Sequence, residues 1–303
     1  MFSPSHRLRH TARKLTTSQL QQDSQDGLSL EDLSLFEVGS RGGDRFLGFY
    51  SQPGLRLALE KYGFFVALAR RGFTNVDIHL DTSDPFLHRL RMEDYGQDHA
   101  RVLGELVVRR ENLVLPLSEA HELSKCHFPM LTIEWLYLQN AQADFNSRRP
   151  QLPGQDHPGL GLARMILELL LVVCWRLNLA GLLNHPAHYH NAVMGASVFR
   201  FANPQAQARF QALQRDLAGY HLQAASWALE WECVYDQARQ EPVVWKPNRY
   251  LIAMDHRLKA YFNSLFYLNQ VWQTMGDYQF DLHNQKFSAK ASQSGIFIPR
   301  IKL

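Results

Sequence analysis

The chain has 303 residues, of which 46% are hydrophobic and 12% aromatic, enough to build a folded core and to exclude an intrinsically disordered protein. Lysine and arginine number 32 against 29 aspartates and glutamates, a formal net charge of +3. So small an excess gives no indication of nucleic acid or an acidic membrane surface as a partner.

The N-terminal segment contains four cationic residues before any acidic one, at Arg7, Arg9, Arg13 and Lys14. It has no apolar stretch of the kind found in a secretory signal, and it continues into a Gln/Ser/Asp-rich sequence. We therefore expect residues 1–27 to be a disordered tail, residues 28–202 to form the main domain and residues 203–303 to form a C-terminal helical extension.

A helix is predicted over 53–71, because Pro53 suits a first helical position, apolar residues then recur at three-and-four spacing, and Gly72 ends the pattern. Strand-like runs follow at 75–80, 86–92 and 101–109, separated by polar or glycine-containing breaks. These three runs predict an antiparallel meander.

A further apolar strand is predicted over 131–139, followed by a proline- and glycine-rich loop, a helix that ends near Asn178 and a strand over 180–189. A strand, a crossover helix and a second strand in this order imply a parallel pair. The whole order predicts an α+β fold, with a mixed, mostly antiparallel sheet flanked by helices.

Beyond Phe201 the pattern becomes helical. Asn203-Pro204 is a good helix start, and three-and-four spacing continues to Val234, which predicts one long amphipathic helix. After a connector over 241–248, a second seam consists of Leu258, Tyr261, Leu265, Leu268, Trp272 and Met275. The two helices predict a C-terminal helical hairpin, which packs on the sheet or on itself or forms the seam of a homodimer.

The cysteines and the longest apolar run limit the setting of the protein. Cys126, Cys174 and Cys233 form no CxxC pair, so neither a disulfide framework nor a thiolate zinc site is indicated. The run from Met165 to Trp175 contains Glu168 and is well short of the roughly 20 residues that cross a bilayer. We expect a cytoplasmic protein that has no membrane partner.

The segment from His157 to Ala163, His-Pro-Gly-Leu-Gly-Leu-Ala, lies between a predicted strand and a predicted helix. Backbone N–H groups and the positive helix end can converge there on an anion, although small residues at such a place also serve simply to pack a helix on a sheet. No Gly-Lys-Ser/Thr follows, and no third glycine completes a dinucleotide-binding fingerprint.

The remaining pattern resembles the GCN5-related N-acetyltransferase (GNAT) superfamily. Gly159 and Gly161 occupy the glycine positions of its Gln/Arg-x-x-Gly-x-Gly/Ala pyrophosphate loop, and Ala192-Val193 and Phe201 follow at similar spacings. By order of elements the resemblance covers residues 53–201. The sequence departs from the family at Asp156, where the family has Gln or Arg, and at Ala196, where the family often has a tyrosine that acts as general acid.

The resemblance implies an acyl-CoA-dependent N-acyltransferase with acetyl-CoA or a longer acyl-CoA as cofactor and a small-molecule or peptide amine as acceptor. It implies that the cofactor binds to two short segments, made of Leu136, Leu138, Gly159, Leu160, Gly161, Leu162 and Ala163. Arg148 and Arg149, which precede the loop, are candidates to meet a phosphate of coenzyme A or are solvated loop residues.

Two groups of residues are candidates to move the proton of the amine. Glu134 lies in an otherwise apolar strand, where the resemblance places a catalytic glutamate; the alternative is a salt-bridged or exposed glutamate. Glu105 is a weaker version of the same case. In an extended chain His188 and His190 share a face, which fits hydrogen-bonded strand-end histidines, proton shuttles or, with a third ligand, metal ligands.

Two other functions stay open at this point. One is a non-catalytic GNAT-like protein that binds a ligand or a partner, for which Ala196 is the main support. The other is a metal-dependent enzyme built on His185, His188 and His190.

Overall fold

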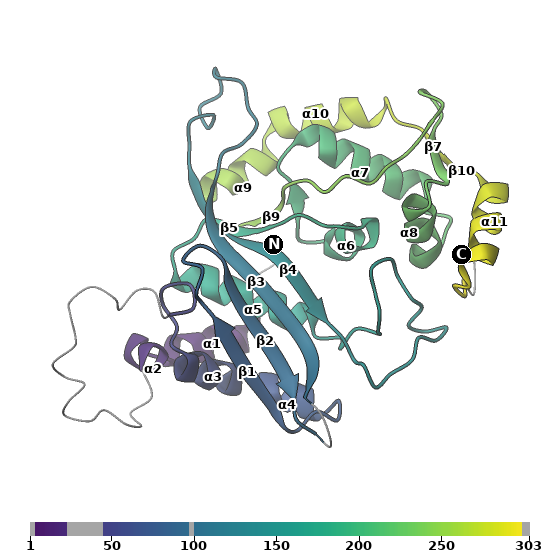
Figure 1. Ribbon diagram of the computed structural model, residues 1–303. Coiled ribbons are helices and arrows are strands. Elements are labelled where there is room, and N and C mark those ends of the chain that lie inside the picture. The colour runs from purple at the N-terminus through teal and green to yellow at the C-terminus, as the bar shows by residue number, and fades with distance from the viewer. Residues whose placement is uncertain (1–3, 23–44, 97–99, 299–303) are drawn as a thin grey trace, which may run out of the picture.

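The computed structural model describes residues 4–22, 45–96 and 100–298. Its centre is a seven-stranded sheet in which only the β4–β5 pair is parallel, and this mixed, mostly antiparallel arrangement confirms the α+β class (Figure 1). In spatial order the strands are β1 (Val76–Asp81), β2 (His88–Asp94), β3 (Arg101–Leu113), β4 (Phe128–Leu138), β5 (Gly181–Asn184), β9 (Tyr250–Ala253) and β6 (Arg200–Phe201).

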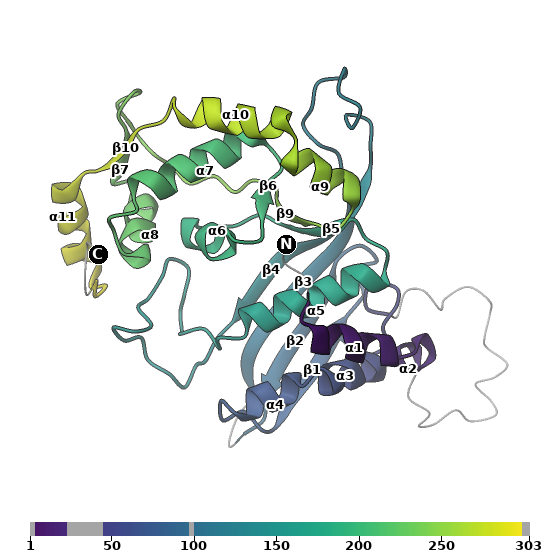
Figure 2. The same ribbon diagram turned by 180° about the vertical axis from the view of Figure 1, so that it is seen from behind.

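One face of the β1–β4 meander is covered by helices, which lie behind the sheet in Figure 1 and in front of it in Figure 2. We call this the helix side. Its helices are α1 (His6–Lys14), α3 (Gln52–Lys61), α4 (Phe64–Ala69) and α5 (Ala163–Arg176). The single helix predicted over 53–71 is divided into α3 and α4 because Gly63 adopts a left-handed conformation with φ of 80°.

The N-terminal segment is ordered over 4–22, so the prediction of a disordered tail is wrong for these residues; residues 1–3 and 23–27 lie outside the described ranges. Besides α1 it forms α2 (Thr17–Gln21). The side chains of Leu8, Ala12 and Leu20 are buried, which is the apolar pattern that the cationic residues obscured. The amide of Ser5 donates to Glu168 of α5 over 3.1 Å, which fixes the start of α1.

The C-terminal third is not a helical extension alone, because it contributes β9, which pairs with both β5 and β6. The predicted boundary at 202/203 therefore does not separate two folding units. The predicted long helix consists of α7 (Pro204–Asp216) and α8 (Leu222–Glu230), with a turn at Gly219 between them.

The second predicted helix is likewise divided, into α9 (His256–Asn263) and α10 (Leu265–Met275). α10 lies beside α7 but runs in the same direction (Figure 1), because Tyr267 at its start donates to the carbonyl of Phe201 just before α7, and Arg215 at the end of α7 donates to the carbonyl of Met275. The two helices therefore pack as a parallel pair and not as the antiparallel hairpin that the sequence predicted. A second sheet of three short strands and the last helix complete the chain, as β7 (Val234–Asp236), β8 (Glu241–Pro242), β10 (Phe280–Leu282) and α11 (Asn284–Ser294).

Side chains alternate between two cores where β4 and β5 pair. Leu131 and Leu182 belong to the core under α5, whereas Met130 and Leu183 belong to a second core that includes Tyr267 of α10. The central sheet is thus covered on both sides at β5 and β9. None of the helices in the described ranges is both long enough and apolar enough to cross a bilayer.

Candidate functional site

The parallel ladder between β4 and β5 is short. It runs from the pair Met130–Gly181 to the pair Ile133–Asn184, where β5 ends, whereas β4 continues to Leu138. Five residues of β4 therefore extend beyond their parallel neighbour, and the two chains separate after Asn184.

A β-bulge lies at the same point. In the β3–β4 ladder Val108 is paired with Ile133 and Val107 with Trp135, so Glu134 has no partner residue on β3. A bulge adds twist and turns the strand locally, which directs the following residues of β4 away from the line of the sheet. The bulge and the end of the parallel ladder together open the sheet at Glu134.

The loop that follows β4 closes the far end of this opening. Figure 1 shows the loop running out from the sheet toward α8 before it returns to α5. On its return, the amide of Leu160 donates to the carbonyl of Leu138 over 3.2 Å, and the amide of Asn140 donates to Pro158 over 2.7 Å. The edge of β4 between Glu134 and Tyr137 is bounded by these contacts and by the last β4–β5 pair. We call this edge the β4 gap.

The glycine loop presents its backbone outward. Leu160 and Leu162 are each 3% exposed and anchor the loop in the core, while Gly161 and Ala163 between and after them are exposed. Gly161 has φ of 68°, which favours glycine. Leu162 is the N-cap of α5 and no side chain caps the helix there, so the first N–H groups of α5 are available to a ligand.

Arg71, at the end of α4, holds this loop. Its Nε donates to the carbonyl of Leu160 over 2.6 Å and its Nη2 donates to Gly161 over 3.2 Å. The guanidinium thus adds a positive charge beside the N-terminus of α5. Sequence reasoning missed Arg71 because it lies 89 residues from Leu160 and no local motif marks it.

These features can hold an anion. A β-carbon added at Gly161 would have only the Arg71 guanidinium within 4 Å, at 3.8 Å, so the outer side of the glycine is open. An exposed glycine, uncapped helical N–H groups and a guanidinium are the donors that a diphosphate requires. Leu136 and Leu138 are half-buried and pack against the core under α5, so they support the gap from the helix side.

Glu134 lies at the mouth of the β4 gap and forms a salt bridge. Its Oε1 is 2.5 Å from Nε of Arg109, whose Nη2 is 2.6 Å from Glu111. The side chain of Glu134 is 34% exposed. The structure therefore shows the salt-bridged glutamate that was the alternative to a free base, and its side chain is partly accessible to solvent. Glu105, the weaker candidate, pairs with Arg89 over 2.6 Å.

The two histidines do not share the face of a strand, because β5 ends at Asn184 and α6 (Tyr189–Gly195) begins directly after His188. Pro186 explains the early end, since proline has no N–H group for a ladder. The rings are nevertheless stacked, with centroids 5.5 Å apart and planes inclined by 10°.

His188 and His190 have different surroundings. Nδ1 of His188 is 3.1 Å from Glu230 of α8, a partner that sequence reasoning missed because it lies on a distant helix. His190 is 2% exposed, and its burial together with the neighbouring His188 lowers its pKa from 6.5 to about 4. Nδ1 of His190 has no hydrogen-bond partner among the described residues. His190 is therefore neutral at neutral pH and a poor proton acceptor.

The loop after β4 covers His188. Gly154 has φ of 73°, which favours glycine, and a β-carbon there would lie 2.6 Å from Nε2 of His188, so the loop backbone passes close to this ring. The loop is held there by α8, because Gln223 and Trp227 both donate to the carbonyl of Gln151, over 3.1 Å and 2.9 Å.

Other predicted residues lie away from the gap or take simple structural roles. Arg148 and Arg149 are exposed in a turn of the long loop, and Asp156 is also exposed. Ala196 is the C-cap of α6. Within the described ranges, no three or more histidine, cysteine or acidic residues are grouped so as to hold a metal ion.

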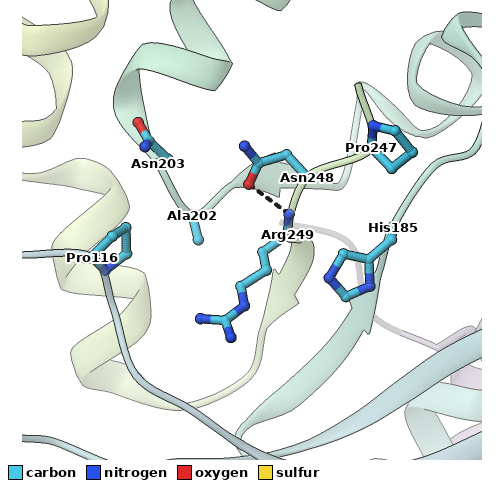
Figure 3. A pocket seen from close by; sticks show the side chains of 7 residues that line it. All are labelled: Pro116, His185, Ala202, Asn203, Pro247, Asn248 and Arg249. Atoms are coloured by element: carbon cyan, nitrogen blue, oxygen red, sulfur yellow. Dashed lines mark hydrogen bonds between the residues drawn. The ribbon is translucent and has the colours of Figure 1, made fainter. Parts of the chain in front are cut away.

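Two cavities accompany this arrangement. One of about 350 Å³ lies between the end of β5 and the start of β9 and includes His185 (Figure 3). Another of about 380 Å³ lies near the small sheet, between Arg209 and Tyr278. Only the first adjoins the end of the β4–β5 ladder, since His185 directly follows Asn184.

No protein-family model matches this sequence, and a search of curated proteins found no match.

Proposed function

We propose that the protein is an acyl-CoA-dependent N-acyltransferase that uses acetyl-CoA or a longer acyl-CoA. One observation carries the proposal: the β4–β5 ladder ends at Ile133–Asn184 while the glycine loop returns to Leu138. An unpaired strand edge therefore leads from an anion-binding helix terminus to the bulge at Glu134.

Each part of this arrangement suits one part of the cofactor. The N–H groups at the start of α5 and the Arg71 guanidinium would hold the pyrophosphate. The backbone of the β4 gap would hydrogen-bond the amides of the pantetheine arm, as a strand edge binds an extended chain. Leu136 and Leu138 would give the arm an apolar support on the helix side.

Acyl-CoA supplies an activated acyl group as a thioester. In the transfer a bond forms between the amine nitrogen and the acyl carbon, the bond from that carbon to sulfur breaks, the amine gives up one proton and the sulfur gains one. Glu134 would take the proton of the amine, because its carboxylate lies at the mouth of the gap and is accessible. His188, oriented by Glu230, is the second candidate.

A small amine or the amino group of a peptide would be the acceptor. The three cysteines are free thiols, which favours a reducing compartment, and we place the protein in the cytoplasm.

The test of this proposal is thermal unfolding of the full chain with and without coenzyme A, acetyl-CoA and longer acyl-CoAs. A ligand that binds only the native state increases the free energy of unfolding, by about 2.7 kcal/mol at a ligand concentration 100 times its Kd, and the melting temperature rises as a result. Gly161→Glu should abolish the rise, because it places a carboxylate where the diphosphate binds. Arg71→Gln should reduce it.

Gly295→Glu is the matched control, because Gly295 ends α11 with φ of 69°, against 68° at Gly161, and a β-carbon there has nothing within 4 Å. It imposes the same backbone strain away from the loop, so it should keep the full rise. If every acyl-CoA leaves the melting temperature of the wild-type chain unchanged, the proposed function is wrong.

A further inference from the structure

The cavity beside His185 opens at the end of the β4–β5 ladder. Val108 of β3 belongs to the core under α5, so Arg109 and its partner Glu134 point to the opposite face of the sheet. Leu183, Leu251 and Ala202 belong to the second core, and Ala202 also lines the cavity. The cavity and Glu134 are therefore on the same side of the sheet, beyond the end of one ladder.

The polar groups that line this cavity favour an anion. They are His185, Asn203, Asn248 and Arg249, and the remaining lining residues are two prolines and one alanine. Among the residues that the structure describes, no acidic side chain lines the cavity. Asn203 also caps α7, whose positive end therefore faces the same region.

Arg249 is the charged group of the cavity. Its Nη1 donates to the carbonyl of Val114 over 3.2 Å, and no carboxylate among the residues the structure describes lies within salt-bridge distance of it. Figure 3 shows the guanidinium reaching into the space between Pro116 and His185. The contact to Val114 positions the guanidinium and leaves other N–H groups for a ligand, because arginine has five donors.

We propose that this cavity binds the carboxylate of the acceptor, so that the substrate amine is an amino acid. The assignment rests on the proposed function, because it reads the cavity as the acceptor end of the β4 gap. The Arg249 guanidinium pairs with the carboxylate, and the amide groups of Asn203 and Asn248 complete the polar wall. A volume of about 350 Å³ accommodates an amino acid of ordinary size.

The test is isothermal titration calorimetry on the full chain, with and without saturating coenzyme A. Glycine, L-leucine and L-phenylalanine are each compared with the corresponding primary amide, which keeps the amine and the side chain and removes the carboxylate. The wild-type chain should bind at least one amino acid about tenfold more tightly than its amide, as expected for a charge-assisted pair.

Arg249→Gln should bring the two affinities to within about twofold, whereas Arg249→Lys, which keeps the charge, should retain part of the preference. Arg200→Gln is the matched control, because Arg200 is also exposed near β9 and also donates to backbone carbonyls, those of Ala196 and Phe199. The Arg200→Gln variant should bind the amino acid more tightly than its amide by the same factor as the wild-type chain. The melting temperature of each variant shows that it is folded.

The two proposals fail separately. If coenzyme A raises the melting temperature but the amides bind as tightly as the acids, or if neither set binds, the assignment of the cavity is wrong. The assignment of the cavity is also wrong if the Arg249→Gln variant still binds the amino acids more tightly than their amides. If no acyl-CoA binds but the amino acid binds through Arg249, the cavity assignment holds and the acyltransferase proposal falls.

Discussion

Ile133 and Asn184 form the last pair of the parallel β4–β5 ladder, and the residue after Ile133 is the bulged Glu134. The end of pairing on one edge of β4 and the bulge on the other edge therefore coincide within one residue. A strand that loses its parallel neighbour and carries a bulge at the same point bends there, although its pairing with β3 resumes at Trp135, and the Glu134 carboxylate lies at the mouth of the gap.

Glu134→Gln should lower turnover by about 10²–10⁴-fold, because the amide keeps the shape of the side chain and cannot take a proton. The measurement is release of free coenzyme A from acetyl-CoA with a pooled set of amino acids and polyamines as acceptors. The melting-temperature rise with coenzyme A should be unchanged, since the variant keeps the groups proposed to hold the pyrophosphate, the first N–H groups of α5 and Arg71.

Glu111→Gln is the control, because it removes a salt bridge to the same Arg109 but lies opposite Met130, inside the paired part of the ladder. It should leave turnover within about twofold of the wild-type value. Equal turnover in Glu134→Gln and the wild type would assign the proton to another group, with His188 the next candidate.

His190 should make the protein less stable in acid. The folded chain holds the pKa of His190 near 4, below the 6.5 of the unfolded chain, so between these values the unfolded chain binds more protons and stability falls as pH falls. Between pH 8 and pH 5, His190 should lower the free energy of unfolding by about 2 kcal/mol. Urea unfolding at several pH values measures it.

His190→Gln should reduce the change in the free energy of unfolding between pH 8 and pH 5, independently of its effect on the stability at pH 8. His127→Gln, at an exposed histidine, should leave the slope unchanged. A slope that is the same in His190→Gln and in the wild type would show that His190 titrates normally in the folded chain.

The meander and α5 could be predicted from the sequence because each is a long run with one period, alternating in the strands and apolar at three-and-four spacing in the helix. Short elements could not. β9 is the four-residue run Tyr-Leu-Ile-Ala, which by itself does not distinguish a strand from a helix fragment, and only its pairing with β5 defines it. The divided helices were missed because apolar spacing continued through Gly63 and Gly219.

The candidate site was predictable to the extent that it is local. The glycine loop and the position of Glu134 follow from neighbouring residues. Arg71, Glu230 and Arg249 reach the site from α4, α8 and the start of β9, so only tertiary structure brings them in. The ion pair between Arg109 and Glu134 could not be predicted either, because the register of β3 against β4 determines which residues are neighbours.

The homodimer expected through the C-terminal helices stays a prediction, and its surface is now defined. Leu258 and Tyr261 of the predicted seam are buried, whereas Leu265, Leu268 and Trp272 of α10 are exposed. Such an apolar helix face favours association. Sedimentation velocity should give a dimer that Trp272→Glu converts to a monomer, while Phe86→Glu, at a side chain with the same 77% exposure, should not. A wild-type monomer at every concentration would refute the prediction.

Gly181→Ala should destabilise the protein because β9 is an integral strand of the central sheet. A β-carbon at Gly181 would overlap the carbonyl oxygen of Ile252 and lie 3.1 Å from the Met130 side chain, so β9 would have to move away from β5. Overpacking of this kind costs about 1–3 kcal/mol. Gly219→Ala, with nothing within 4 Å of the added carbon, should stay within about 0.5 kcal/mol of the wild type in urea unfolding. Equal stability of the two variants would mean that residues after 203 do not complete the sheet and that the Arg249 cavity is not formed as described.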